Sequence, residues 1–153
     1  MSKETIEQTE EQNLSTDIGS LVLTDDAVNA IDNGVWVGDF KGYPGVSFKV
    51  RGMGSDIAKK RMADEKAKAR IGNEGEVLSE EQLAKVAAKV LADAILLDWK
   101  GLTDGGKEVK YTKALADKWL NSRNGEKLAL LVLRAAYRVD AEPNAFVEKA
   151  TKN

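Results

Sequence analysis

Residues 101–107 form the stretch of the sequence that comes closest to a known phosphate-binding motif. They read Gly-Leu-Thr-Asp-Gly-Gly-Lys, which has the glycine and lysine spacing of a P-loop. A P-loop continues with a Ser or Thr that ligates Mg²⁺, follows a strand and opens a helix. Here Glu108 takes that next position, and the apolar residues before the loop have a helical pattern. The sequence therefore predicts a turn at this point and no nucleotide site.

The side chains that most often carry catalysis are missing. The chain contains no histidine and no cysteine, which removes Ser-His and Cys-His pairs and the usual zinc ligand sets. The adjacent carboxylates Glu80-Glu81 and Asp25-Asp26 fall at predicted helix starts, where the positive end of the helix dipole favours them. No loop has the aspartate spacing of a calcium site. We expect no catalytic residue, no cofactor and no metal ligand, and so a protein that is not an enzyme.

Charge is unevenly distributed, although the net charge is only −2. The first 34 residues hold one base, Lys3, against the acids Glu4, Glu7, Glu10, Glu11, Asp17, Asp25, Asp26 and Asp32. Bases then gather in one segment, at Lys59, Lys60, Arg61, Lys66, Lys68 and Arg70. Two solvated faces are the simpler interpretation. The alternative is an acidic arm that folds back on the basic segment or docks on a partner until it is displaced.

The basic segment also raises nucleic acid as a partner, because clustered Lys and Arg neutralise phosphates. Asp64 and Glu65 interrupt the cluster, and the chain as a whole is acidic. We therefore expect no nucleic-acid binding. No run reaches the ~18 apolar residues of a membrane-spanning helix, and Met1–Asn13 does not resemble a signal peptide. We expect no membrane contact and a soluble protein of a reducing compartment.

The first third of the chain predicts an arm followed by strands. Residues 1–19 lack periodicity and indicate a disordered or extended arm, 20–24 favour a short strand, and Asp25 to Asn33 favour a short helix. The β-rich runs at 35–40 and 46–51 flank a Pro-Gly turn and predict a hairpin. A lone hairpin is marginal in water. It must pack on helices, pair with the strand at 20–24, or join a sheet in another subunit.

Helices are predicted over the remainder. Ser55 can cap a basic helix over 56–71 whose apolar stripe is thin, so that it is either largely solvated or covered by an acidic partner. Ser79 and Gln82 form a capping box for a strongly apolar helix to Leu97, which we expect to be the central core helix. The predicted fold class is mainly α, a small helical domain with an N-terminal β-hairpin and an extended acidic arm. Its predicted parts are 1–34 (arm), 35–52 (hairpin) and 53–153 (helical domain).

An ordered junction at 98–112 interrupts the helical pattern. Trp99 ends an apolar run, Asp-Gly-Gly supplies the positive φ of a tight turn, and Thr112 can cap the next helix. Trp99 and Tyr111 are large aromatic anchors at the two ends of the junction, and core packing is the simplest interpretation of both.

The carboxyl-terminal part of the chain resembles tail assembly chaperones of long-tailed bacteriophages. The resemblance rests on Trp99-x-Gly101, the Asp-Gly-Gly-Lys turn at 104–107, Tyr111-Thr112 at a helix start, and the ending 146–153. It spans about residues 46–153. It implies a non-catalytic protein that coats the helical tape-measure protein and recruits tail-tube subunits, in some members in two lengths made by a frameshift. The implied location is the cytoplasm of the bacterial host during infection.

Two other interpretations stay open: a permanent virion component (minor capsid, decoration or tail protein) that uses its arm for subunit contacts, and a small inhibitor of a host protein. The expected partners are phage structural proteins, namely tape-measure, tail-tube or neighbouring virion subunits, and a homo-oligomer is compatible with the pattern. Our candidates for partner-binding residues are Lys59, Lys60, Arg61, Lys66, Arg70, Trp99, Lys107 and Tyr111.

Overall fold

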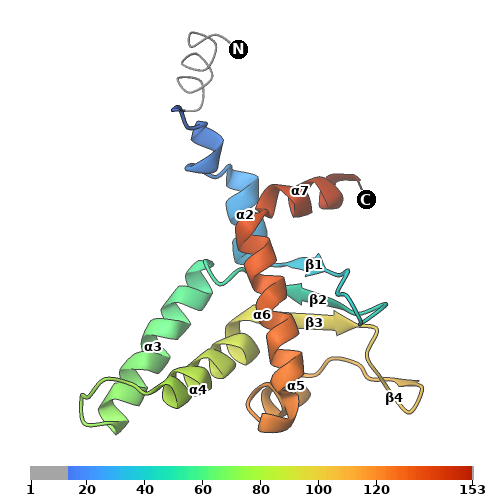
Figure 1. Cartoon of the computed structure of the whole chain (residues 1–153). Coiled ribbons are helices and arrows are strands. Elements are labelled where there is room, and N and C mark those ends of the chain that lie inside the picture. Colours follow the sequence, from blue (N-terminus) through green and yellow to red (C-terminus); the bar gives the residue numbers. More distant parts are fainter. Residues whose placement is uncertain (1–13, 153) are drawn as a thin grey trace, which may run out of the picture.

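The fold is mainly α with a few short strands, as predicted, in a computed structural model that describes residues 14–152 (Figure 1). Residues 1–13 of the predicted arm (1–34) lie outside the described residues, and residues 25–33 of it form the helix α2. The helices are η1 (Ile18–Ser20), α2 (Asp25–Asn33), α3 (Asp56–Gly72), α4 (Glu80–Val90), the π-helical turn η2 (Leu91–Ile95), α5 (Lys113–Leu120), η3 (Arg123–Gly125), α6 (Glu126–Ala141) and α7 (Pro143–Lys152). The strands are β1 (Val35–Val37), β2 (Ser47–Val50), β3 (Leu96–Lys100), β4 (Thr103–Asp104) and β5 (Lys107–Glu108).

The predicted hairpin is confirmed and gains a third strand from the same chain. β1 and β2 pair antiparallel with Val35 opposite Val50 and Val37 opposite Phe48. β3 pairs antiparallel with the other edge of β2, where Trp99 lies opposite Phe48. Because β2 has a partner on both edges, the hairpin does not depend on a second subunit for its pairing. The strand predicted at 20–24 is wrong, since this segment contains only the end of η1, a turn and extended residues.

The apolar run at 91–97 does not continue the helix to Leu97, and the prediction is wrong there. α4 ends at Val90, the chain makes the π-helical turn η2, and β3 begins at Leu96. Leu91, Ala94 and Ile95 are buried, so the apolar side chains of this run lie in the core. A continuous apolar run fits a buried helix and a buried strand equally well, and periodicity cannot separate the two.

Local capping chemistry follows the sequence closely. Ser55 accepts a hydrogen bond from the amide of Ala58 at the start of α3, and Ser79 and Gln82 form the predicted reciprocal capping box of α4. Thr112 accepts from Leu115 at the start of α5. Each cap satisfies an amide that the first helical turn leaves without an intrahelical partner. α2 is likewise capped by Thr24, and its Ala27 and Ile31 are buried against the body of the protein.

The core lies between the sheet and α6. Figure 1 shows α6 crossing the sheet, with α3 and α4 side by side as a pair that extends away from it. The largest fully buried apolar side chains come from the sheet, α4, η2 and α6, and they are Phe48, Ile95, Val37, Val50, Val90, Val132 and Val139. No described helix is long and apolar enough to cross a membrane.

An aromatic cluster joins the sheet to α5. The Trp99 ring is 4% exposed, stacks on Trp119 with 5.6 Å between ring centroids, and meets Tyr111 edge-on at 5.1 Å. Its Nε1 donates a 2.7 Å hydrogen bond to the carbonyl of Val109. One side chain therefore holds β3, the junction after it and the next helix together. The prediction that Trp99 is a core aromatic is confirmed.

We expect Trp99→Ala to lower the free energy of unfolding by about 3–5 kcal/mol, because it empties a large buried volume. Trp99→Phe should cost less, since it keeps most of the apolar contact and loses the bond to Val109. Urea unfolding followed by circular dichroism measures both. Equal stability of Trp99→Ala and wild type would show that the ring contributes nothing to packing.

Candidate partner-binding surfaces

The cations of α3 divide into two groups, and one group is occupied within the chain. Glu65 is only 4% exposed and lies between α3 and α4. Its carboxylate oxygens lie 3.5 Å from Arg61 Nη2, 3.5 Å from Lys68 Nζ and 3.6 Å from Lys89 Nζ of α4. The side of α3 that carries Glu65 is thus covered by α4 of the same chain. Arg61, one of the predicted partner-binding residues, is committed to an internal ion-pair network.

Asp93, in the π-helical turn η2, links this network to α5. Its Oδ2 lies 2.6 Å from Arg61 Nη2, and its Oδ1 lies 2.6 Å from Lys113 Nζ. Burial by itself raises the pKa of Asp93, but hydrogen bonds and charge from Lys113 and Arg61 outweigh it, so the pKa lies below the ordinary value of 3.8. The carboxylate therefore stays ionised at neutral pH and ties α3, η2 and α5 together.

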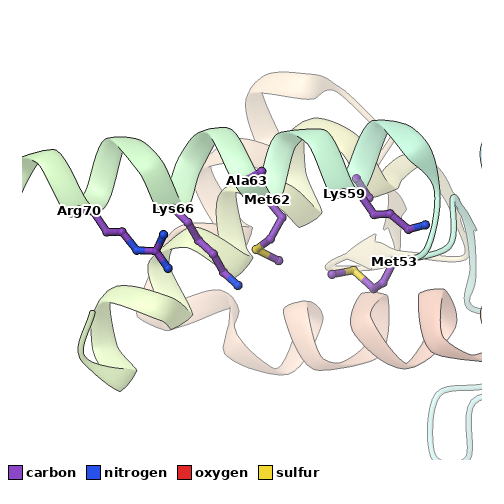
Figure 2. A pocket seen from close by; sticks show the side chains of 7 residues that line it. Met53, Lys59, Met62, Ala63, Lys66 and Arg70 are labelled. Atoms are coloured by element: carbon purple, nitrogen blue, oxygen red, sulfur yellow. The ribbon is translucent and has the colours of Figure 1, made fainter. Parts of the chain in front are cut away.

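The second group of cations lines a hollow beneath α3. Figure 2 shows Met53 and Met62 pointing into the same space, with Lys66 and Arg70 farther along the helix. The hollow measures about 420 Å³ and is lined by Met53, Ala58, Lys59, Met62, Ala63, Lys66 and Arg70. Among the described residues, no carboxylate forms an ion pair within 4 Å with Lys59, Lys66 or Arg70. We call this surface the α3 hollow: an apolar floor of adaptable methionines with a cationic rim.

A turn held by Asp140 places Met53 in the α3 hollow. The Asp140 carboxylate, at the end of α6, accepts hydrogen bonds from the amide of Gly54 at 3.1 and 3.2 Å. Burial raises the pKa of Asp140, and these backbone amides and the charge of Lys59 oppose that rise. A Cβ at Gly52 would lie 2.2 Å from Asp140 Oδ1, so the approach of α6 to this turn requires glycine.

A second and larger concavity runs between α4 and α6, and the sequence reasoning missed it. This α4–α6 groove measures about 690 Å³. Its apolar lining is Ala84, Ala87, Ala88, Leu91, Leu120, Ala129, Leu130 and Leu133, and its polar rim is Glu81, Lys85, Asn121, Ser122, Arg123 and Glu126. Leu130 is 54% exposed there. The available signal was that α6 carries apolar residues outside its core-facing side, at Ala129, Leu130 and Leu133.

The predicted partner-binding residues do not converge on one surface. Lys59, Lys66 and Arg70 share the α3 hollow, whereas Lys60 is exposed and lines neither the hollow nor the α4–α6 groove. Trp99 is buried, and the half-buried Tyr111 packs against it. Lys107 lies at the exposed end of the β4–β5 hairpin. Only the first three residues form a shared site.

The glycine bend at 101–107 has a structural explanation. Gly101 has a φ of +81°, and a Cβ there would lie 2.0 Å from the carbonyl oxygen of Gly45. Gly105 and Gly106, both with positive φ, form the two-residue turn between β4 and β5, where primed turns require such angles. A strand and not a helix precedes the bend, but the bend opens a hairpin and no helix follows directly. Among the described residues, no group of three potential metal ligands is found either.

Comparison with known protein families gives a match. A family model described as YdaY prophage protein matches residues 49–153. The matched region begins within β2 and includes the α3 hollow, the α4–α6 groove and the aromatic cluster. No match was found among the curated proteins or among the solved structures.

We expect Asp93→Asn to reduce stability at neutral pH and to have little effect in acid. Because the folded pKa of Asp93 is lowered, its contribution is present above pH 3.8 and is lost as the pH falls through the folded pKa. The exposure of its partners limits the effect to at most about 1 kcal/mol. Urea midpoints at pH 7 and pH 3 measure it.

A matched control is Asp104→Asn, at an exposed aspartate of the β4–β5 turn with no ion pair within 4 Å among the described residues. An equal deficit at both pH values would contradict this linkage.

Proposed function

The chain belongs to the YdaY prophage protein family, and we propose that it is a phage tail assembly chaperone that binds tape-measure or tail-tube protein during tail morphogenesis. The observation that carries this proposal is the α4–α6 groove. On this proposal the protein is not an enzyme and acts in the host cytoplasm through the partner that it holds.

The groove has the chemistry of a site for an amphipathic helix. Ala84, Ala88 and Leu91 recur at i, i+4 and i+7 on α4, and Ala129, Leu130 and Leu133 face them from α6. Small alanines let a third helix approach closely, while the leucines provide apolar contacts for its anchors at the same spacing. Acidic and basic side chains alternate along the rim, at Glu81, Lys85, Arg123 and Glu126, which suits a partner with mixed charge.

The resemblance to tail assembly chaperones supplies the identity of that helix. A tape-measure protein is long and helical, so it has amphipathic segments whose apolar faces must be shielded from water until the tail tube encloses them. The absence of histidine and cysteine from the sequence supports a binding role. A binding protein of this kind needs only an apolar groove with a polar rim, and both are provided by α4, η3 and α6.

A capture experiment tests the proposal. Tagged protein expressed with the tape-measure and tail-tube proteins of the same prophage is expected to retain one of them. Leu130→Glu should weaken the complex about tenfold or more, since it places a charge on the exposed apolar side chain of the groove.

Tyr137→Glu is the matched control, because Tyr137 is also exposed on α6 (56%) but lies outside the groove. Retention of neither tail protein by the wild type, or equal loss with both variants, would refute the proposal. A chaperone should also be absent from purified particles by mass spectrometry.

The alternative function is a permanent virion component. The exposed apolar side chains of residues 14–23 favour it, because an arm with such side chains can pack against a neighbouring subunit. Presence of the protein in purified particles at a fixed copy number would support this alternative over a chaperone.

A further inference from the structure

The segment before α2 carries an apolar stripe that contacts little of its own chain. Leu14, Ile18, Leu21 and Val22 are 83%, 67%, 74% and 59% exposed. Their spacing of i, i+4, i+7 and i+8 would place them on one side of a helix if the whole segment were helical; in the structure only Ile18–Ser20 is helical, as η1, and Asp17 before it is extended. Figure 1 shows this segment lying beyond the start of α2, away from the sheet and from α3. So many exposed apolar side chains within nine residues indicate a contact surface.

The α3 hollow is complementary to this stripe in side-chain chemistry and in charge. Its floor offers Met53 and Met62, whose flexible thioether side chains adapt to branched aliphatic partners. Its rim offers Lys59, Lys66 and Arg70, which have no ion-pair partner within 4 Å among the described residues. The segment carries Asp17, is followed by Asp25 and Asp26, and is preceded in the sequence by four glutamates.

We propose that residues 14–22 of one copy bind in the α3 hollow of a second copy. The apolar stripe lies on the methionine floor, and the acidic side chains face the lysines and the arginine of the rim. From Ala58 to Arg70 the helix is about 18 Å long, which accommodates the ~12 Å that residues 14–22 span as a helix. Reciprocal exchange of the two arms closes a two-fold symmetric dimer.

The position of α2 disfavours binding of this segment in the hollow of the same chain. The far end of α2 adjoins the start of α3, where the amide of Asp56 donates to Asp32 Oδ1 at 3.1 Å. The arm leaves from the opposite end of α2, a helix of nine residues and so about 13 Å long. Val22 is three residues before Asp25, a reach of at most about 10 Å. Buried Ala27 and Ile31 hold α2 in place, so Val22 falls short of the start of α3 in its own chain, and we assign the hollow to a second copy.

Engineered cysteines test this directly, because the chain has none of its own. Chains carrying only Ile18→Cys are mixed with chains carrying only Met62→Cys and oxidised, so that any disulfide between positions 18 and 62 must join two copies. We expect a cross-linked dimer on a non-reducing gel. Leu130→Cys in place of Met62→Cys is the matched control at the α4–α6 groove and should give at least about tenfold less product.

A solution measurement completes the test. Sedimentation of the full chain is expected to show a dimer whose dissociation constant rises about tenfold or more in Ile18→Ser and in Lys66→Glu. Both positions lie on the surface of the fold, so unchanged circular dichroism should confirm that folding is intact. A monomeric wild type, a cross-link to position 130 alone, or an intrachain cross-link in a chain bearing both Ile18→Cys and Met62→Cys would overturn the proposal. None of these outcomes depends on whether the α4–α6 groove binds a tail protein.

Discussion

Strand β2 has two edges to pair, and the pairing of its second edge determines the course of the middle of the chain. A hairpin of β1 and β2 alone is marginal in water, and β3 completes it from residues almost fifty positions away. To pair with β2, the chain must turn away from the axis of α4, and it does so within η2. That change of direction brings Trp99 opposite Phe48 and against α5. The aromatic cluster therefore forms because β3 pairs with β2.

The same turn organises the charges of α3. η2 presents Asp93 to Arg61 and Lys113, and the adjacent α4 encloses Glu65 with Lys89. These two carboxylates occupy the cations on one side of α3 and leave Lys59, Lys66 and Arg70 around the hollow. A cluster that looks uniform in the sequence is thus divided by the packing of α4. Only its outward part is available to another molecule.

Patterns that depend on a few neighbouring residues could be predicted, and patterns that depend on distant ones could not. Ser55, Ser79 and Thr112 identify helix starts because a cap acts on an amide three residues away. The hairpin follows from alternation and its turn. β3 could not be identified from the run that contains it, because its strand character comes from the free edge of β2. Glu65 shows the same limit, since its burial depends on the packing of α4, which brings Lys89 to its carboxylate. The α4–α6 groove depends on how two helices, 35 residues or more apart in sequence, pack around η2.

The position of α4 keeps the two candidate surfaces separate. One side of α4 packs on α3 through Val86 and Val90, and Ala84, Ala87 and Ala88 on another side line the groove with α6. An arm bound in the α3 hollow therefore leaves the groove open. A dimer formed by arm exchange would carry two such grooves at a fixed separation. Two grooves that engage successive segments of one long helical partner would raise its effective affinity well above that of a single groove, provided that the partner spans both. If both proposals hold, self-association through the arm would strengthen the capture of a partner helix.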